Sequence, residues 1–173
     1  MVYKTVMMDP PWYERGAGKI KRGADRHYPI LKTPDIIKTI YQCEHWNQVS
    51  DVAHLYMWVT NNFLVDGLQV MQSLGFRYVT NFVWVKNKQG LGQYFRGQHE
   101  LCLLGTRGVG AAQLRTDNKS LPSVLSAPRT KHSQKPTTSY DLIEQRSIGP
   151  YLEIFGRSQR EGWTVWGNEI KEE

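Results

Sequence analysis

The chain has 173 residues, of which 40% are hydrophobic and 22% are charged, so its composition is that of a folded globular protein and excludes a disordered chain. Two cysteines, and five histidines without metal-ligand spacing, predict neither a disulfide framework nor a metal site. A formal net charge of +6 favours a polyanionic partner such as nucleic acid.

No apolar run approaches the roughly 20 residues that span a bilayer, and the N-terminus does not resemble a signal peptide. We therefore expect one cytoplasmic domain over residues 1–173 that does not bind membranes.

Short apolar segments and helical patterns alternate along the chain. Strands are predicted, in order, at Tyr3–Met8, Leu55–Val59, Tyr78–Val85, Leu101–Gly105, Leu152–Phe155 and Trp163–Trp166. Helices are predicted after an N-cap at Thr33, from about Asn62 to Leu74, and from Pro136 to about Arg146. This alternation favours a doubly wound, mostly parallel α/β sheet, in which ligands bind at the carboxyl ends of the strands.

The turn Asp9-Pro10-Pro11-Trp12 follows the first predicted strand directly. The Asp9 carboxylate and the Pro10 carbonyl could each accept a hydrogen from the N6 amine of adenine, which localises its lone pair and stabilises the charge gained on methylation. Pro10 and Pro11 restrict the backbone, and Trp12 offers a face for base stacking. The alternative is a strand end with a Pro-Pro turn and a buried tryptophan.

Basic residues crowd a glycine-containing segment between residues 15 and 26 that has no helical or strand pattern. We expect a mobile loop in which Lys19, Lys21 and Arg22 contact phosphates, and we expect Arg96, in a second polar segment, to do the same. Ordinary surface cations remain the alternative.

Several spaced motifs follow the first turn in a fixed order. They are Tyr56-Met57-Trp58-Val59-Thr60, Trp84-Val85-Lys86, Gly97-Gln98-His99-Glu100, Ser133-Gln134-Lys135-Pro136, Glu153-Ile154-Phe155-Gly156-Arg157 and Trp166-Gly167-Asn168. Together with the turn they resemble the MT-A70 family of adenine-N6 methyltransferases over nearly the whole chain. The resemblance implies a Rossmann-like fold dependent on S-adenosylmethionine, with the permuted, beta-type motif order that places the catalytic strand first.

The resemblance also implies roles for individual residues. Asp9, Ser133 and Lys135 would hold the methionine end of S-adenosylmethionine, while Arg157, Gln159, Asn168 and Glu169 would lie near its ribose and adenine. Tyr28 would line the substrate adenine pocket, or else be a core aromatic. Trp58 and Trp84 are expected in the core and the pocket wall, and Gly156 is expected to let the backbone approach the ligand.

The sequence departs from the family pattern at a few positions. Met8 stands where alanine is common, Gln159-Arg160 where the large eukaryotic enzyme has His-Asn, and Glu169 where it has Gln. The sequence also begins at the catalytic strand, without the upstream segment that contacts the cofactor adenine in longer relatives. These departures bear on cofactor affinity and ribose contacts, not on the reaction type.

DNA is slightly favoured over RNA as the substrate, because short members of this kind are commonly phage or bacterial DNA enzymes, and RNA stays open. A catalytically silent, nucleic-acid-binding partner subunit is the alternative from another class; such relatives typically lose the acidic residue that is present here as Asp9. A homodimer is left open as the assembly.

Replacing Lys19, Lys21 and Arg22 together by alanine should weaken nucleic-acid binding and spare cofactor affinity. Each lost phosphate contact should flatten the plot of log affinity against log salt by about 0.7–0.9. Binding titrations at several salt concentrations check this, and an unchanged slope in the triple variant would show that these side chains do not contact phosphates.

Overall fold

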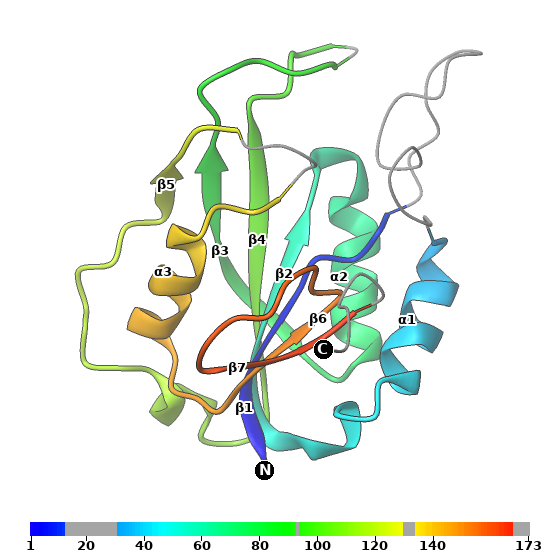
Figure 1. The fold of residues 1–173 in the computed structure, drawn as a ribbon, viewed down its shortest axis with the longest axis vertical. Coiled ribbons are helices and arrows are strands. Elements are labelled where there is room, and N and C mark those ends of the chain that lie inside the picture. The colour runs from blue at the N-terminus through cyan, green and yellow to red at the C-terminus, as the bar shows by residue number, and fades with distance from the viewer. Residues whose placement is uncertain (13–30, 93, 130–133, 168–173) are drawn as a thin grey trace.

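The computed structural model describes residues 1–12, 31–92, 94–129 and 134–167. These residues form a seven-stranded sheet in the order β5-β3-β4-β2-β1-β6-β7 (Figure 1). The strands are β1 (Tyr3–Met8), β2 (Val49–Val59), β3 (Arg77–Val85), β4 (His99–Arg107), β5 (Val124–Ser126), β6 (Tyr151–Ile154) and β7 (Trp163–Trp166). The helices are α1 (Thr33–Gln42), α2 (Leu64–Ser73) and α3 (Thr138–Arg146), with short 3-10 turns η2 (Trp46–Gln48), η3 (Asn61–Phe63) and η4 (Ala111–Leu114).

The sheet is mostly parallel, as predicted. β1 pairs in parallel with β2 and β6, as do β6 with β7 and β3 with β5, while β4 runs antiparallel to β2 and β3. Alternate residues of the central strands enter two separate cores because successive side chains point to opposite faces of a sheet. One core includes residues of α1 and α2, and the other includes Ile143 of α3, so helices cover both faces (Figure 1). The doubly wound, Rossmann-like prediction is therefore confirmed.

The order of the strands reverses at β1. The chain leaves β1 to build the β2 side of the sheet and returns only at β6, on the other flank of β1. Met8 is in register with Met57 of β2 and with Ile154 of β6, so Asp9 and Phe155 lie at the same edge, just beyond the ends of two neighbouring parallel strands. Ligands bind at such a switch point in doubly wound sheets.

Some sequence expectations need correction. β2 begins at Val49 instead of Leu55, and β5 lies inside what was expected to be a loop. The N-cap of α1 is Lys32, with no side-chain cap, because the Thr33 hydroxyl donates to the Asp66 carboxylate at 2.6 Å, which ties α1 to α2.

A buried polar network anchors the C-terminal end of α3 to the sheet. Ser147 Oγ lies 2.7 Å from His54 Nδ1 and 2.6 Å from the Tyr56 hydroxyl, and His54 Nε2 lies 2.8 Å from the Ala111 carbonyl. Burial lowers the pKa of His54, so a neutral ring donates from Nε2 and accepts at Nδ1.

Within the described ranges no helix has the length and apolarity to cross a membrane.

Candidate active site

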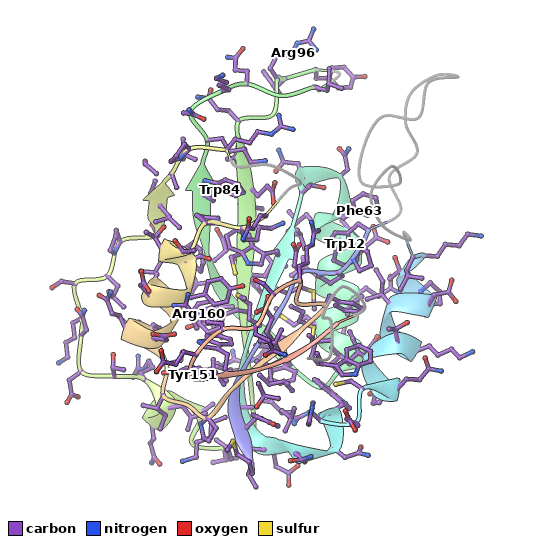
Figure 2. The ribbon with its side chains drawn as sticks, viewed as in Figure 1. Trp12, Phe63, Trp84, Arg96, Tyr151 and Arg160 are labelled. Atoms are coloured by element: carbon purple, nitrogen blue, oxygen red, sulfur yellow. The ribbon has the colours of Figure 1, made fainter. Side chains whose placement is uncertain are left out.

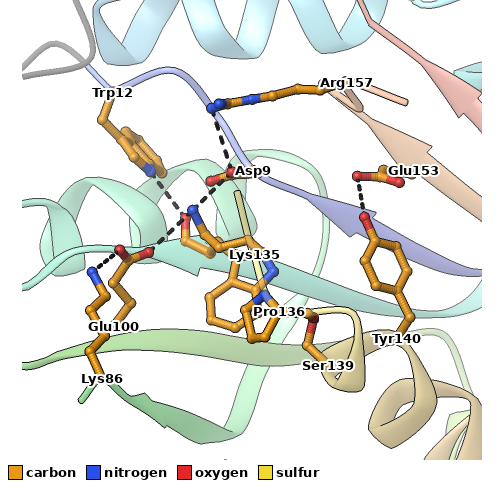
Figure 3. A network of polar contacts seen from close by, with 11 residues as sticks. Asp9, Trp12, Lys86, Glu100, Lys135, Pro136, Ser139, Tyr140, Glu153 and Arg157 are labelled. Atoms are coloured by element: carbon orange, nitrogen blue, oxygen red, sulfur yellow. Dashed lines mark hydrogen bonds and ion pairs between the residues drawn. The ribbon is translucent and has the colours of Figure 1, made fainter. Parts of the chain in front are cut away.

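Asp9 leaves the end of β1 with its side chain 17% exposed, and two cations from distant parts of the chain meet it (Figure 3). Lys135 Nζ donates to Asp9 Oδ2 at 2.9 Å, and Arg157 Nη2 lies 4.0 Å from the same oxygen. Both contacts use Oδ2, so Asp9 Oδ1 has no partner among the residues that the structure describes. The carboxylate is thus held in place while one oxygen can still accept a hydrogen bond.

Lys135 is positioned by the turn that opens α3. The Pro136 carbonyl accepts hydrogen bonds from the Ser139 backbone N–H at 2.9 Å and from the Ser139 hydroxyl at 2.6 Å, which closes the first turn ahead of the helix. Lys135 Nζ lies 5.5 Å from the centroid of the Trp58 ring, a distance at which a cation is attracted to the aromatic face. Trp58 and Trp84 are both fully buried, so the expectation of core residues holds for the two of them.

A second carboxylate shares the Lys135 ammonium. Glu100 of β4 contacts Lys135 Nζ at 3.2 Å and accepts a hydrogen bond from Lys86, which directly follows β3 (Figure 3). Burial opposes the charged form of Glu100, but the attraction of Lys135 and Lys86 outweighs it and holds the pKa of Glu100 below its usual range. Burial likewise opposes the charge on Lys135, and Asp9 with Glu100 outweighs it, so the pKa of Lys135 is raised. Glu100 and Lys135 are therefore both charged near neutral pH despite their burial.

The turn after β6 lies opposite Asp9. Phe155 has a backbone φ of 67°, a conformation that is uncommon for a residue other than glycine and that is found preferentially at functional sites. Gly156 has a packing reason to lack a side chain: a Cβ there would lie 2.1 Å from Val165 Cγ1 of β7. Packing against β7 is therefore one reason for glycine at this position, while a close approach of the Gly156 backbone to a ligand stays a prediction.

The Pro-Pro turn is rigid and internally bonded. The Pro10 carbonyl already accepts the Trp12 N–H at 2.9 Å, and a carbonyl oxygen has a second lone pair for another donor. Trp12 is buried, its ring is stacked on Phe63 at 5.6 Å, and its Nε1 donates to the Trp58 carbonyl at 3.0 Å (Figure 2). Trp12 thus fixes the turn against β2 and η3, and one face of its ring is covered, while stacking of a base on Trp12 stays a prediction.

Glu153 of β6 is a buried acid beside this site. The residue is only 6% exposed, and its Oε1 accepts a hydrogen bond from the Tyr140 hydroxyl at 2.9 Å. Its Oε2 is buried and has no hydrogen-bond partner among the described residues. An unsatisfied buried oxygen is costly, and a bound ligand with an ammonium or hydroxyl donor would satisfy it.

The remaining predicted residues lie farther out or cannot be placed. Gln159 is exposed in the segment after β6, and Arg96 is exposed on the connection between β3 and β4, where its Nη1 lies 3.4 Å from the Gly92 carbonyl (Figure 2). Seven expected site residues lie outside the described residues: Lys19, Lys21, Arg22, Tyr28, Ser133, Asn168 and Glu169.

Sequence reasoning gave no role to Lys86, Glu100 or Glu153, although all three stand in the motifs quoted above. A charged residue inside or next to an otherwise apolar strand, as in Leu152–Ile154, was the signal available, because such residues are rarely buried unless they have a partner. This signal could not identify the partner of each charge, because partners such as Glu100 and Lys135 stand far apart in the sequence and meet only in the folded protein.

Glu153 should make folding stability depend on pH. Burial raises the pKa of Glu153 to about 7, from an ordinary value of 4.5, so the folded state binds the proton more tightly than the unfolded chain. This contribution is fully present below pH 4.5 and is lost as the pH rises towards 7, at up to about 1.4 kcal/mol per pH unit. Glu153→Gln should remove that part of the slope, measured by urea unfolding of both proteins across the interval. Identical slopes for the wild type and the variant would mean that folding does not raise the pKa of Glu153.

Comparison with known proteins agrees with this arrangement. The chain is 29% identical to the type II methyltransferase M.MunI of a Mycoplasma species, over 97% of this chain and 78% of that protein. It is 26% identical to the human N(6)-adenosine-methyltransferase catalytic subunit METTL3 and 28% identical to the human N(6)-adenine-specific methyltransferase METTL4. These two matches also cover 97% of this chain, but only 28% and 37% of the human proteins. The family model described as MT-A70 matches residues 3–169, and the chain therefore belongs to the MT-A70 family.

Proposed function

We propose that this chain transfers the methyl group of S-adenosylmethionine to the N6 amine of adenine in DNA. The observation that carries the proposal is the Asp9 carboxylate at the switch point of the sheet, held through Oδ2 by Lys135 with Oδ1 available as an acceptor. The similarity to M.MunI, a type II methyltransferase, to METTL3, an N(6)-adenosine-methyltransferase subunit, and to METTL4, an N(6)-adenine-specific methyltransferase, supports the same reaction.

The residues around Asp9 suit S-adenosylmethionine. The unsatisfied Glu153 Oε2 can accept a hydrogen bond from an ammonium or hydroxyl group, and Lys135 and Arg157 supply positive charge for a carboxylate. Lys135, Arg157 and Glu153 would hold the molecule, together with Ser133, Gln159, Asn168 and Glu169 by family resemblance. When bound, S-adenosylmethionine supplies an electrophilic methyl group on a positively charged sulfur.

The chain's own groups prepare the amine. Adenine N6 is a poor nucleophile because its lone pair is delocalised into the ring. Asp9 Oδ1 accepts one N6–H and the second lone pair of the Pro10 carbonyl accepts the other, which favours a pyramidal nitrogen with a localised lone pair. As the nitrogen–methyl bond formed, the bond between that methyl group and the cofactor sulfur would break and leave a neutral thioether. The nitrogen would gain positive charge beside the Asp9 carboxylate, and the surplus N6 proton would then leave to water. The hydrogen bond from Lys135 holds the carboxylate in this position throughout.

We propose DNA in preference to RNA because the chain matches 78% of the length of the type II methyltransferase M.MunI. It matches only 28% of the length of the N(6)-adenosine-methyltransferase subunit METTL3. The alternative of a catalytically silent partner subunit is disfavoured by Asp9 and by its ion pair with Lys135. RNA methylation and silent binding are both outcomes of the experiments below.

Asp9→Ala should leave the protein folded and reduce single-turnover methyl transfer at saturating cofactor by ~10²–10³, the usual cost of losing one preorganised electrostatic group. Asp9→Asn keeps the shape and one acceptor oxygen but removes the charge, so it should retain only a small residual rate. Circular dichroism and cofactor titration accompany each variant.

The matched control is Asp35→Asn, which removes an exposed carboxylate on α1. It should turn over at the wild-type rate. If a folded Asp9 variant also did so, the catalytic assignment of the whole turn would be wrong.

A further inference from the structure

We propose that the connection between β3 and β4, residues 86–98, is a wedge that inserts Tyr94 and Phe95 into a DNA duplex beside the target adenine. The proposal rests on the proposed function and adds how a base inside a duplex would reach Asp9. Enzymes that act on a base must first take it out of the stack, and apolar side chains inserted between base steps are one means of doing so.

The tip of this wedge is apolar and unpacked. Tyr94 is 95% exposed, Phe95 is 90% exposed and Leu91 is 70% exposed, all within five positions of one another. Among the described residues neither aromatic ring stacks on another ring or makes a side-chain hydrogen bond. Two adjacent aromatic side chains held fully in water expose a large apolar surface, and such surface marks a site of interaction.

The backbone beneath the tip is already formed. The Lys86 N–H donates to the Gln98 carbonyl at 2.8 Å, and the Gly90 N–H donates to the Gly97 carbonyl at 2.6 Å. The turn is tight enough that a Cβ on Gly92 would lie 1.9 Å from the Phe95 carbonyl oxygen, so only glycine fits there. Because these bonds already hold the segment below the tip, less conformational freedom is lost when the two aromatics bind.

The charge of the segment selects the partner. Residues 86–98 contain Lys86, Lys88 and Arg96 and no acidic residue. Lys88 and Arg96 are exposed, and they flank the aromatic tip on both sides in the sequence. Cations around an inserted aromatic match a duplex, because phosphates flank every base step.

The wedge projects from the edge of the sheet that carries the site. β3 runs antiparallel to β4, which runs antiparallel to β2, which is parallel to β1, so the end of β3 lies at the same edge as Asp9 (Figure 1). The start of the wedge is connected to the site through side chains. Lys86 donates a hydrogen bond to Glu100, Glu100 forms an ion pair with Lys135, and Lys135 forms an ion pair with Asp9. An adenine that the tip pushes out of the duplex would therefore leave the stack at the edge of the sheet that carries Asp9.

The test uses the double variant Tyr94→Ala/Phe95→Ala and a duplex that the wild-type protein methylates, made in two forms. In one form the target adenine is paired with thymine, and in the other it faces an abasic site, where leaving the stack is already easy. The variant should lose about 10–100-fold in single-turnover rate on the paired form and stay within about threefold on the abasic form. With 2-aminopurine as the target base, wild-type binding should raise its fluorescence and variant binding should not.

Two comparisons keep the outcomes distinct. Tyr78→Ala removes an exposed aromatic at the opposite end of β3 and should behave as the wild type. If the wild-type protein methylates adenine in no DNA at all, so that no such duplex can be chosen, the proposed function itself is overturned. The wedge would be overturned if the double variant lost the same activity on both duplex forms, or lost activity on neither. It would also be overturned if the variant showed no selective loss but the free protein changed its sedimentation coefficient, a result that would assign the tip to protein association.

Discussion

The rest of the structure depends on one buried cation held between two carboxylates. The Lys135 side chain is only 9% exposed, and it is charged because Asp9 and Glu100 contact it at 2.9 and 3.2 Å. Breaking such a buried pair by removing one partner typically costs about 3–5 kcal/mol, because the other charge is left without compensation. The network joins the end of β1, the start of β4 and the segment that leads into α3, so it fixes the three parts of the chain that border the site.

The same charges serve chemistry as well as stability. A carboxylate that is already held in position and partly shielded from water does not need to reorganise when positive charge develops beside it. Asp9 stands at the point where the strand order reverses, and doubly wound sheets have a crevice for ligands at this point. Arg157 and the strained Phe155 complete this edge from the β6 side, so the two neighbouring parallel strands each deliver one half of the site.

The sequence predicted the fold well where local patterns carry the information. The apolar run Tyr3–Met8 and the Gly75 stop of α2, with φ of 79°, are encoded within a few residues. The first half of β2 and the edge strand β5 were missed because Ser50 and Asp51 interrupt the apolar pattern and β5 has only three residues. Thr33 was taken as a cap because nothing local shows that Asp66, from another helix, competes for its hydroxyl. The site was also predicted only where the information is local. Asp9 and Lys135 stand in recognisable motifs, whereas the roles of Glu100, Lys86 and the buried Glu153 depend on partners that folding brings close.

The most direct test of a methyl-transferring site at Asp9 is incubation of the purified protein with S-adenosylmethionine labelled in its methyl group. Parallel reactions contain DNA and RNA, each single- and double-stranded, and the products are digested to nucleosides and separated. We expect label in N6-methyldeoxyadenosine from DNA, and we expect Asp9→Ala to abolish it. Label in N6-methyladenosine from RNA alone would keep the chemistry and reassign the substrate, whereas no label above the Asp9→Ala background in any nucleic acid would contradict the account.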